Sequence, residues 1–239
     1  MEAGVIFLSG QFNRPDLIRE NHYYYNDQDY HYGCGFVIDN KTFFSYSFGL
    51  KAEYSLNKRI AIASGVRYNF FKAVLNSDRD YFLWKVSETE TSANYITIKN
   101  ISQKNYYIGI PLELKLFPRE KDYFVRQYFI FGTLFNFLVV SNSEVAFQNQ
   151  KMEKYSSEVM KNIGNPNRFQ TVVYAGVGLK IGKLKYPVGN IEFHFPVLTF
   201  GKNNPNSFTK TAGSVGFGIR TTFQIPVIKK HQIIYTVED

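Results

Sequence analysis

The sequence predicts an all-β protein, an eight-stranded antiparallel up-and-down transmembrane β-barrel with short periplasmic turns and long extracellular loops. Three observations predict this fold. Eight segments alternate apolar with small or polar residues, their connections alternate between long and short, and the apolar face of seven segments has no Asp, Glu, Lys or Arg. The 239 residues fit one domain, 1–239, with strands within 4–225 and a C-terminal tail at 226–239.

The clearest alternation covers residues 43–70. Large apolar residues at even positions, such as Phe48, alternate with Ser, Gly, Lys and Glu as far as a break at Asn57 and Lys58. After the break the pattern resumes at Ile60, with residues such as Val66 on the apolar face. Period two on both sides of a two-residue break predicts two strands joined by a tight hairpin.

Six further segments complete the barrel. The register of the first segment, 4–12, is not fixed by its pattern. The third, 127–140, has weak sidedness because apolar residues occupy both of its faces. The other four repeat the alternation of the opening hairpin, with glycines and charged residues sharing one face. The six segments are 4–12, 106–117, 127–140, 169–182, 190–198 and 214–225.

The connections between these segments predict the arrangement of the strands. Because long and short links alternate, all long loops emerge at one end of a meander, as in bacterial transmembrane barrels. A soluble lipocalin-like barrel is not expected to show this regularity. The long links are 13–40, 73–105, 141–168 and 199–212, and the short ones are 57–58, 118–123 and 183–189.

The charged face of the strands is predicted to point inward. An eight-stranded barrel has an interior just wide enough for its side chains, and the many Phe, Tyr and Leu would overfill it, whereas the glycines of the other face suit a crowded lumen. Buried charges persist when they are paired, so we expect a structural polar network and no open pore. Its predicted members are Lys51, Glu53, Arg67, Glu113, Lys115, Lys180, Glu192, His194 and Arg220. A polar conduit or a binding site is the functional alternative for these residues.

Composition narrows the function classes. The formal net charge is +8, but the basic residues are scattered and form no nucleic-acid motif, so no nucleic-acid partner is expected. The single cysteine, Cys34, lacks the paired spacing of a zinc site, and neither a metal nor a cofactor is expected. The first residues, MEAGVIFLSG, have no basic region before a long apolar stretch, so an exported protein would have lost its signal peptide.

The long connections hold candidate contact residues. Tyr and Trp provide binding area at little entropic cost, although the same aromatics could form interfacial girdles or extend strands. Within 141–168, Met152, Tyr155, Val159 and Ile163 are spaced to form one face of a short helix that ends at Gly164 and caps the barrel or touches a partner. The candidate contact residues are Tyr23, Tyr24, Tyr25, Tyr30, Tyr32 and Trp84.

Several strand sequences resemble a known family. The runs YYIGIPLELKLFP, YFIFGTLFNFLV, VYAGVGLKIG, IEFHFPVLTFGKN and VGFGIRTTF are similar to those of small outer-membrane β-barrel proteins of the Bacteroidota, often called porin-like or PorT-like, over roughly residues 41–225. The resemblance implies an outer-membrane location in a didermic bacterium, in contact with outer-membrane lipid. Most members have no assigned activity, and some work in secretion or envelope assemblies.

The expected function is a non-enzymatic scaffold or accessory binding subunit that meets other envelope proteins through its extracellular loops. One alternative is a lipid-modifying enzyme, because FHFPVLTFGKNNPNSF faintly resembles the final hairpin of lipid A deacylases. In those enzymes a serine nucleophile follows the histidine by two positions, whereas here Pro196 follows His194, so no catalytic residue is expected. A soluble ligand-binding barrel is the third possibility.

Overall fold

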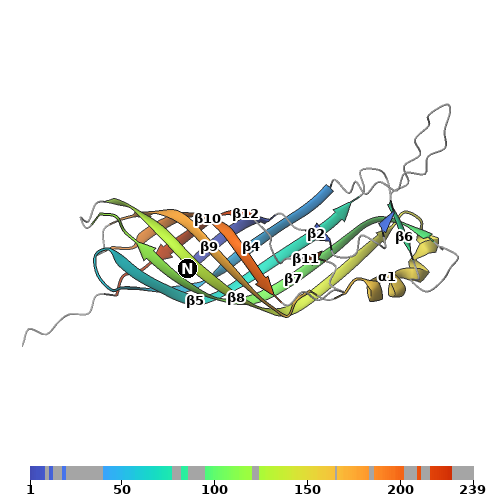
Figure 1. The fold of residues 1–239 in the computed structure, drawn as a ribbon, viewed down its shortest axis with the longest axis horizontal. Coiled ribbons are helices and arrows are strands. Elements are labelled where there is room, and N and C mark those ends of the chain that lie inside the picture. The colour runs from blue at the N-terminus through green and yellow to red at the C-terminus, as the bar shows by residue number, and fades with distance from the viewer. Residues whose placement is uncertain are drawn as a thin grey trace, which may run out of the picture.

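The computed structural model contains a closed barrel of eight antiparallel strands (Figure 1). It describes residues 1–8, 11–12, 18–19, 40–76, 82–85, 95–119, 124–164, 166–182, 186–201, 209–210 and 216–227. The barrel strands are β1 (Glu2–Leu8), β4 (Asn40–Ser55), β5 (Ile60–Asn76), β7 (Tyr95–Leu116), β8 (Val125–Phe147), β9 (Phe169–Ile181), β10 (Val188–Gly201) and β12 (Gly216–Gln224).

Each barrel strand pairs with the next one along the chain, so the predicted up-and-down order is confirmed. The ring closes at the N-terminal strand, because β1 lies between β12 and β4, with Val5 opposite both Ile219 and Tyr46. This pairing supplies the register of the first strand that the sequence pattern left open. Closure leaves no free edge along the barrel, which removes the usual site of strand-to-strand aggregation.

The two faces of the strands point as predicted. Outward positions are apolar and exposed: Phe48 is 59 % exposed, Val66 57 % and Phe131 49 %. Inward positions on the barrel strands are buried, including Arg67 at 2 % and Lys115 at 1 %. The side chains of an eight-stranded barrel fill its interior, so the bulky residues remain outside.

The short connections lie together at one end of the barrel. At the hairpin between β4 and β5, the Asn57 side chain closes the turn, because its Oδ1 accepts hydrogen bonds from the backbone N–H groups of Arg59 and Ile60, both at 2.8 Å. The Leu56 N–H donates to the Ile60 carbonyl at 2.9 Å. The other two short connections join Leu116 to Val125 and Ile181 to Val188 at the same end.

Strands β5, β7 and β8 extend well past their predicted ends and project beyond the opposite end of the barrel, and β4 stays paired with β5 as far as Asn40 and Asn76 (Figure 1). β5 continues to Asn76, β7 begins at Tyr95 rather than 106, and β8 continues to Phe147 rather than 140. Predictions of long loops over 73–105 and 141–168 are therefore wrong for these parts. One physical reason is a β-bulge between Ile98 and Asn100, which shifts the buried residues of β7 from even positions, such as Ile98, to odd ones, such as Ile101, and breaks the period-two pattern.

The projecting part has a hydrophobic core of its own, and we call it the head. It comprises the ends of β5, β7 and β8 with β6 (Phe82–Lys85), β3 (Ile18–Arg19), the 3₁₀ helix η2 (Gln150–Tyr155) and α1 (Ser156–Asn162). The predicted face of four residues packs here, although η2 and α1 share it: Val159 and Ile163 are buried, and Met152 and Tyr155 pack against them. No helix in the described ranges is long and apolar enough to span a membrane.

Trp84 belongs to the core of the head, since its side chain is fully buried beside Leu75 and Ile98. Its prediction as an exposed contact residue is therefore wrong, because the loop predicted around it contains strand β6, which pairs with β7.

The tyrosines predicted as contacts and Cys34 lie outside the described residues. β2 (Gln11–Phe12) pairs with β11 (Thr209–Lys210) as a separate two-stranded sheet. The predicted contact tyrosines are Tyr23, Tyr24, Tyr25, Tyr30 and Tyr32.

Candidate functional site

The lumen of the barrel contains a network of buried charges to which all eight strands contribute a side chain. Every charged residue predicted from the sequence lies in it, together with Glu2 of β1, which the sequence pattern did not reveal. Neutral Tyr128 of β8 and Tyr174 of β9 complete it. The members predicted from the sequence are Lys51, Glu53, Arg67, Glu113, Lys115, Lys180, Glu192, His194 and Arg220.

Glu113 is the centre of the network. Its Oε1 accepts hydrogen bonds from Arg220 Nη1 and from the Tyr174 hydroxyl, both at 2.6 Å, and from Arg67 Nη2 at 3.3 Å. Its Oε2 accepts one from Lys51 Nζ at 3.0 Å. A single carboxylate thus receives donors from four other strands, and charge-assisted hydrogen bonds of this kind are about twice as strong as neutral ones.

Two further carboxylates flank this centre. Glu2 accepts from Arg67 Nε at 2.6 Å and from its Nη2 at 3.3 Å, which is a bidentate pair. Glu192 is fully buried, accepts from Arg220 and, at 2.6 Å, from the Tyr128 hydroxyl, and lies 2.9 Å from Lys115 Nζ. Each carboxylate therefore contacts at least one cation.

A second layer lies nearer the short connections. Here Glu53 lies 2.8 Å from both Lys115 Nζ and Lys180 Nζ, and it accepts a hydrogen bond from Gln224 Nε2 at 2.9 Å. Lys115 joins the two layers because it also contacts Glu192. The lumen is thus crossed by connected ion pairs rather than by an open aqueous path.

The charges of the network do not balance. Among the described residues of the ion-pair network, five cations face four carboxylates, which leaves one positive charge in excess while His194 is neutral. A buried excess charge is unfavourable unless a counter-ion or hydrogen-bonding groups compensate it. The cations are Lys51, Arg67, Lys115, Lys180 and Arg220, and the carboxylates are Glu2, Glu53, Glu113 and Glu192.

Two glycines give the tyrosines room to reach the carboxylates. Gly132 lies directly opposite Tyr174 across the strand pair, and Gly178 lies directly opposite Tyr128. A Cβ at Gly132 would lie 2.5 Å from the Tyr174 ring, and one at Gly178 would lie 2.4 Å from the Tyr128 ring. Each ring therefore lies over a glycine and extends its hydroxyl toward the centre of the lumen.

We expect Gly132→Ala to displace the Tyr174 ring and weaken its hydrogen bond to Glu113, lowering the free energy of unfolding by about 1–3 kcal/mol, the usual cost of overpacking. Urea unfolding followed by tyrosine fluorescence measures the loss. Gly189→Ala is the matched control, because a Cβ there meets nothing within 4 Å. Equal stability of the two variants would contradict the role of Gly132.

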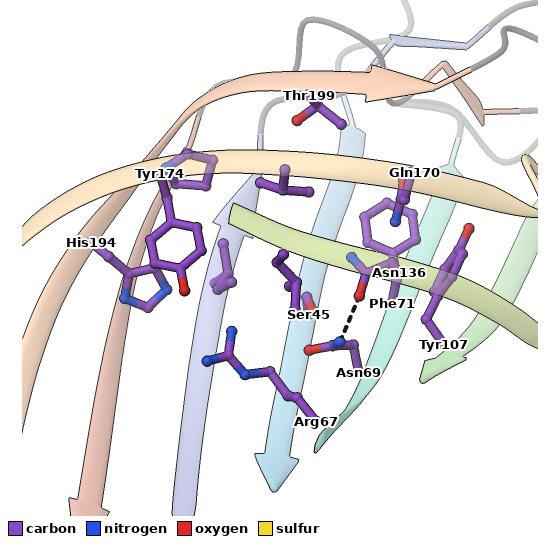
Figure 2. A pocket seen from close by; sticks show the side chains of 14 residues that line it. Ser45, Arg67, Asn69, Phe71, Tyr107, Asn136, Gln170, Tyr174, His194 and Thr199 are labelled. Atoms are coloured by element: carbon purple, nitrogen blue, oxygen red, sulfur yellow. Dashed lines mark hydrogen bonds between the residues drawn. The ribbon is translucent and has the colours of Figure 1, made fainter. Parts of the chain in front are cut away.

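A small cavity lies beside the network, on the side of the head (Figure 2). Arg67 and His194 line it together with uncharged groups such as Asn136 and Gln170. His194 is 3 % exposed, its ring is tilted against Tyr174 with the centroids 5.8 Å apart, and its Nδ1 has no hydrogen-bond partner among the described residues. The histidine was predicted to lie in the lumen and does so, but the described groups do not satisfy it.

The network members that could not be predicted from the sequence share one property. The roles of Tyr128, Tyr174 and Glu2 depend on which residue lies opposite them, and this register follows from barrel closure rather than from a local pattern. Comparisons with known proteins add no constraint: the chain matches no family model, no curated protein and no solved structure. The resemblance to small outer-membrane barrels of the Bacteroidota therefore stays a prediction.

Proposed function

We propose that the protein is a non-enzymatic β-barrel of a bacterial outer membrane that acts through its head as a scaffold or accessory binding subunit of an envelope or secretion assembly. The observation that carries the membrane part is the outward face. On β7 the outward residues from Tyr106 to Leu116 are uncharged, and the first outward charge beyond them is Lys104. Exposed apolar surface of this extent on a monomer marks an interaction surface.

The height of the uncharged face fits a membrane. Ten residue spacings separate Tyr106 from Leu116, or about 34 Å along the strand. At a strand tilt of about 40° this is roughly 26 Å along the barrel axis, close to the apolar band of about 25 Å in outer-membrane barrels. The outward residues Tyr46 to Leu56 and Ile60 to Phe70 span the same number of spacings.

Charges mark both edges of this band. Lys58, Arg59 and Arg119 lie at the end with the short connections. At the other edge Lys104 donates to Glu144 at 2.7 Å, and this hydrogen bond lowers the pKa of the Glu144 carboxyl. Charged groups at both rims and none among the described outward strand residues between them are the pattern of a barrel that is surrounded by lipid.

The head supports the binding role. It stands beyond the band, and its fully buried Trp84, Leu75 and Val159 give it a fixed shape. Its strands are also joined by polar contacts, since Gln103 Nε2 donates to Ser143 Oγ and to the Gly164 carbonyl, both at 3.3 Å. A binding surface on such ordered elements loses less conformational entropy when a partner binds than a surface made of mobile loops would.

The lipid-modifying alternative gains no support from the site. A catalytic histidine acting on lipid A has to reach the outer surface, whereas His194 is 3 % exposed within the lumen. Pro196, at the position of the serine nucleophile, also lines the cavity and has no hydroxyl. We therefore expect lipid A mass spectra to be the same with and without the protein, and a lost or gained acyl chain would favour the enzyme.

Localisation and partner contact are tested in native cells. We expect the protein in the outer-membrane fraction, with faster gel mobility before boiling than after it, because a closed barrel resists unfolding by detergent at low temperature. A photo-crosslinker in place of Glu158, exposed on α1, should give a discrete adduct. The same group in place of Arg119, at the opposite end, should give none. Recovery in the soluble fraction, or equal adducts at both sites, would contradict the proposal.

A further inference from the structure

The cavity beside the lumen network has a defined place and size. It lies between Arg67 and the layer of Tyr107 and Gln170, with His194 on one side and Asn136 on the other (Figure 2). Its volume is about 60 Å³. Since one water needs about 10–15 Å³ of such cavity volume, the cavity has room for about four water-sized groups.

Two buried polar side chains at the cavity wall have no partner. Nδ1 of His194 and Oε1 of Gln170 make no hydrogen bond with the described residues, and these two residues are only 3 % and 9 % exposed. Buried polar groups in native proteins rarely lack a hydrogen-bond partner, so each of these two atoms needs an explanation. A ligand that hydrogen-bonds to them within the cavity supplies one.

The remaining polar groups of the cavity are mainly donors. Arg67 uses Nε and Nη2 for Glu2 and Glu113, and its Nη1 donates to no described residue. Asn136 accepts from Asn69 Nδ2 at 2.8 Å through its Oδ1, and its Nδ2 likewise donates to none in the described ranges. A neutral imidazole donates from Nδ1 in one tautomer, and the Gln170 amide presents an NH₂ group when rotated by half a turn.

Charge points to the same kind of ligand. The five cations and four carboxylates of the described ion-pair network leave one positive charge in excess, and Arg67, at the cavity wall, belongs to this network. Phe71, Leu134 and Val172 also line the cavity and give it an apolar wall. We propose that the cavity binds a small monovalent anion of the size of acetate, with its carboxylate toward Arg67 and its methyl group toward this wall.

This proposal goes beyond the proposed function and does not rest on it, because it concerns only the interior of the barrel. Acetate and acetamide provide the direct test, since they have the same number of heavy atoms and differ in charge. Saturation-transfer NMR on the purified protein in detergent should detect bound acetate. Acetamide should bind at least about tenfold more weakly, because it loses the charge-assisted hydrogen bonds. Equal binding of both would overturn the anion assignment.

Three variants test the location. Gln170→Leu removes a polar group from the wall, and Val172→Phe fills the space; both should abolish the acetate signal. Asn190→Leu is the matched control, because Asn190 is also buried with an unpartnered amide but does not line the cavity, and it should bind acetate like the wild type. If Val172→Phe fails to fold, Gln170→Leu decides. Retained binding in the folded cavity variants, or a crystal structure grown in acetate with only water in the cavity, would overturn the proposal.

Discussion

Glu113→Gln is expected to lower the free energy of unfolding by about 3–5 kcal/mol, the usual cost of removing one partner of a buried ion pair. The carboxylate accepts from Arg67, Arg220 and Lys51, and the side chains of all three are buried. The substitution nearly preserves shape but raises the excess positive charge of the ion-pair network from one to two. Urea titration of the protein refolded in detergent micelles or lipid vesicles measures the change.

Glu144→Gln is the matched control for this experiment. Glu144 also accepts from a lysine, Lys104 at 2.7 Å, but it is exposed at the rim of the barrel, where water and salt screen the pair. No measurable loss of stability is expected there. If Glu113→Gln were as stable as Glu144→Gln, the buried network would not hold the barrel together, and its charges would need another explanation.

The barrel itself could be predicted because its constraints act either along a single strand or on the ring of eight strands as a whole. Period two assigned alternate residues such as Phe48 and Lys51 to opposite faces, and the limited volume of eight strands decided which face was inside. The head could not be predicted in this way. Its strand β7 has a β-bulge near Ile98, and there the period-two pattern changes phase.

The candidate site could likewise be predicted only in part. Residues such as Arg67 and Glu192 could be placed in the lumen from the phase of their strands alone. Their partners could not, because Arg67 is 65 residues from Glu2 in the chain and Arg220 is 107 from Glu113. The cavity depends on still finer detail, since it exists only where the side chains of several strands fail to meet. No local sequence signal reports such a gap.

Val66→Arg is expected to lower the free energy of unfolding in lipid vesicles by about 2–4 kcal/mol, the cost of a charge near the middle of the bilayer. Val66 is 57 % exposed on the outward face of β5, midway along the uncharged band, so in the proposed membrane position the arginine would contact acyl chains. Leu56→Arg is the control with similar exposure, 54 %, but at the hairpin turn. Near the interface its cost should fall to about 0–1 kcal/mol.

The difference between these two variants separates the membrane from the soluble interpretation. In water both side chains lie on an exposed surface, and surface substitutions usually change stability by no more than about 0.5 kcal/mol, whatever their position along the strand. In a bilayer the cost depends on depth, because water and headgroups solvate the arginine only near the ends of the band. A depth-dependent penalty therefore supports the lipid-facing band, and two equally stable variants would mean that the apolar face is covered by something other than lipid.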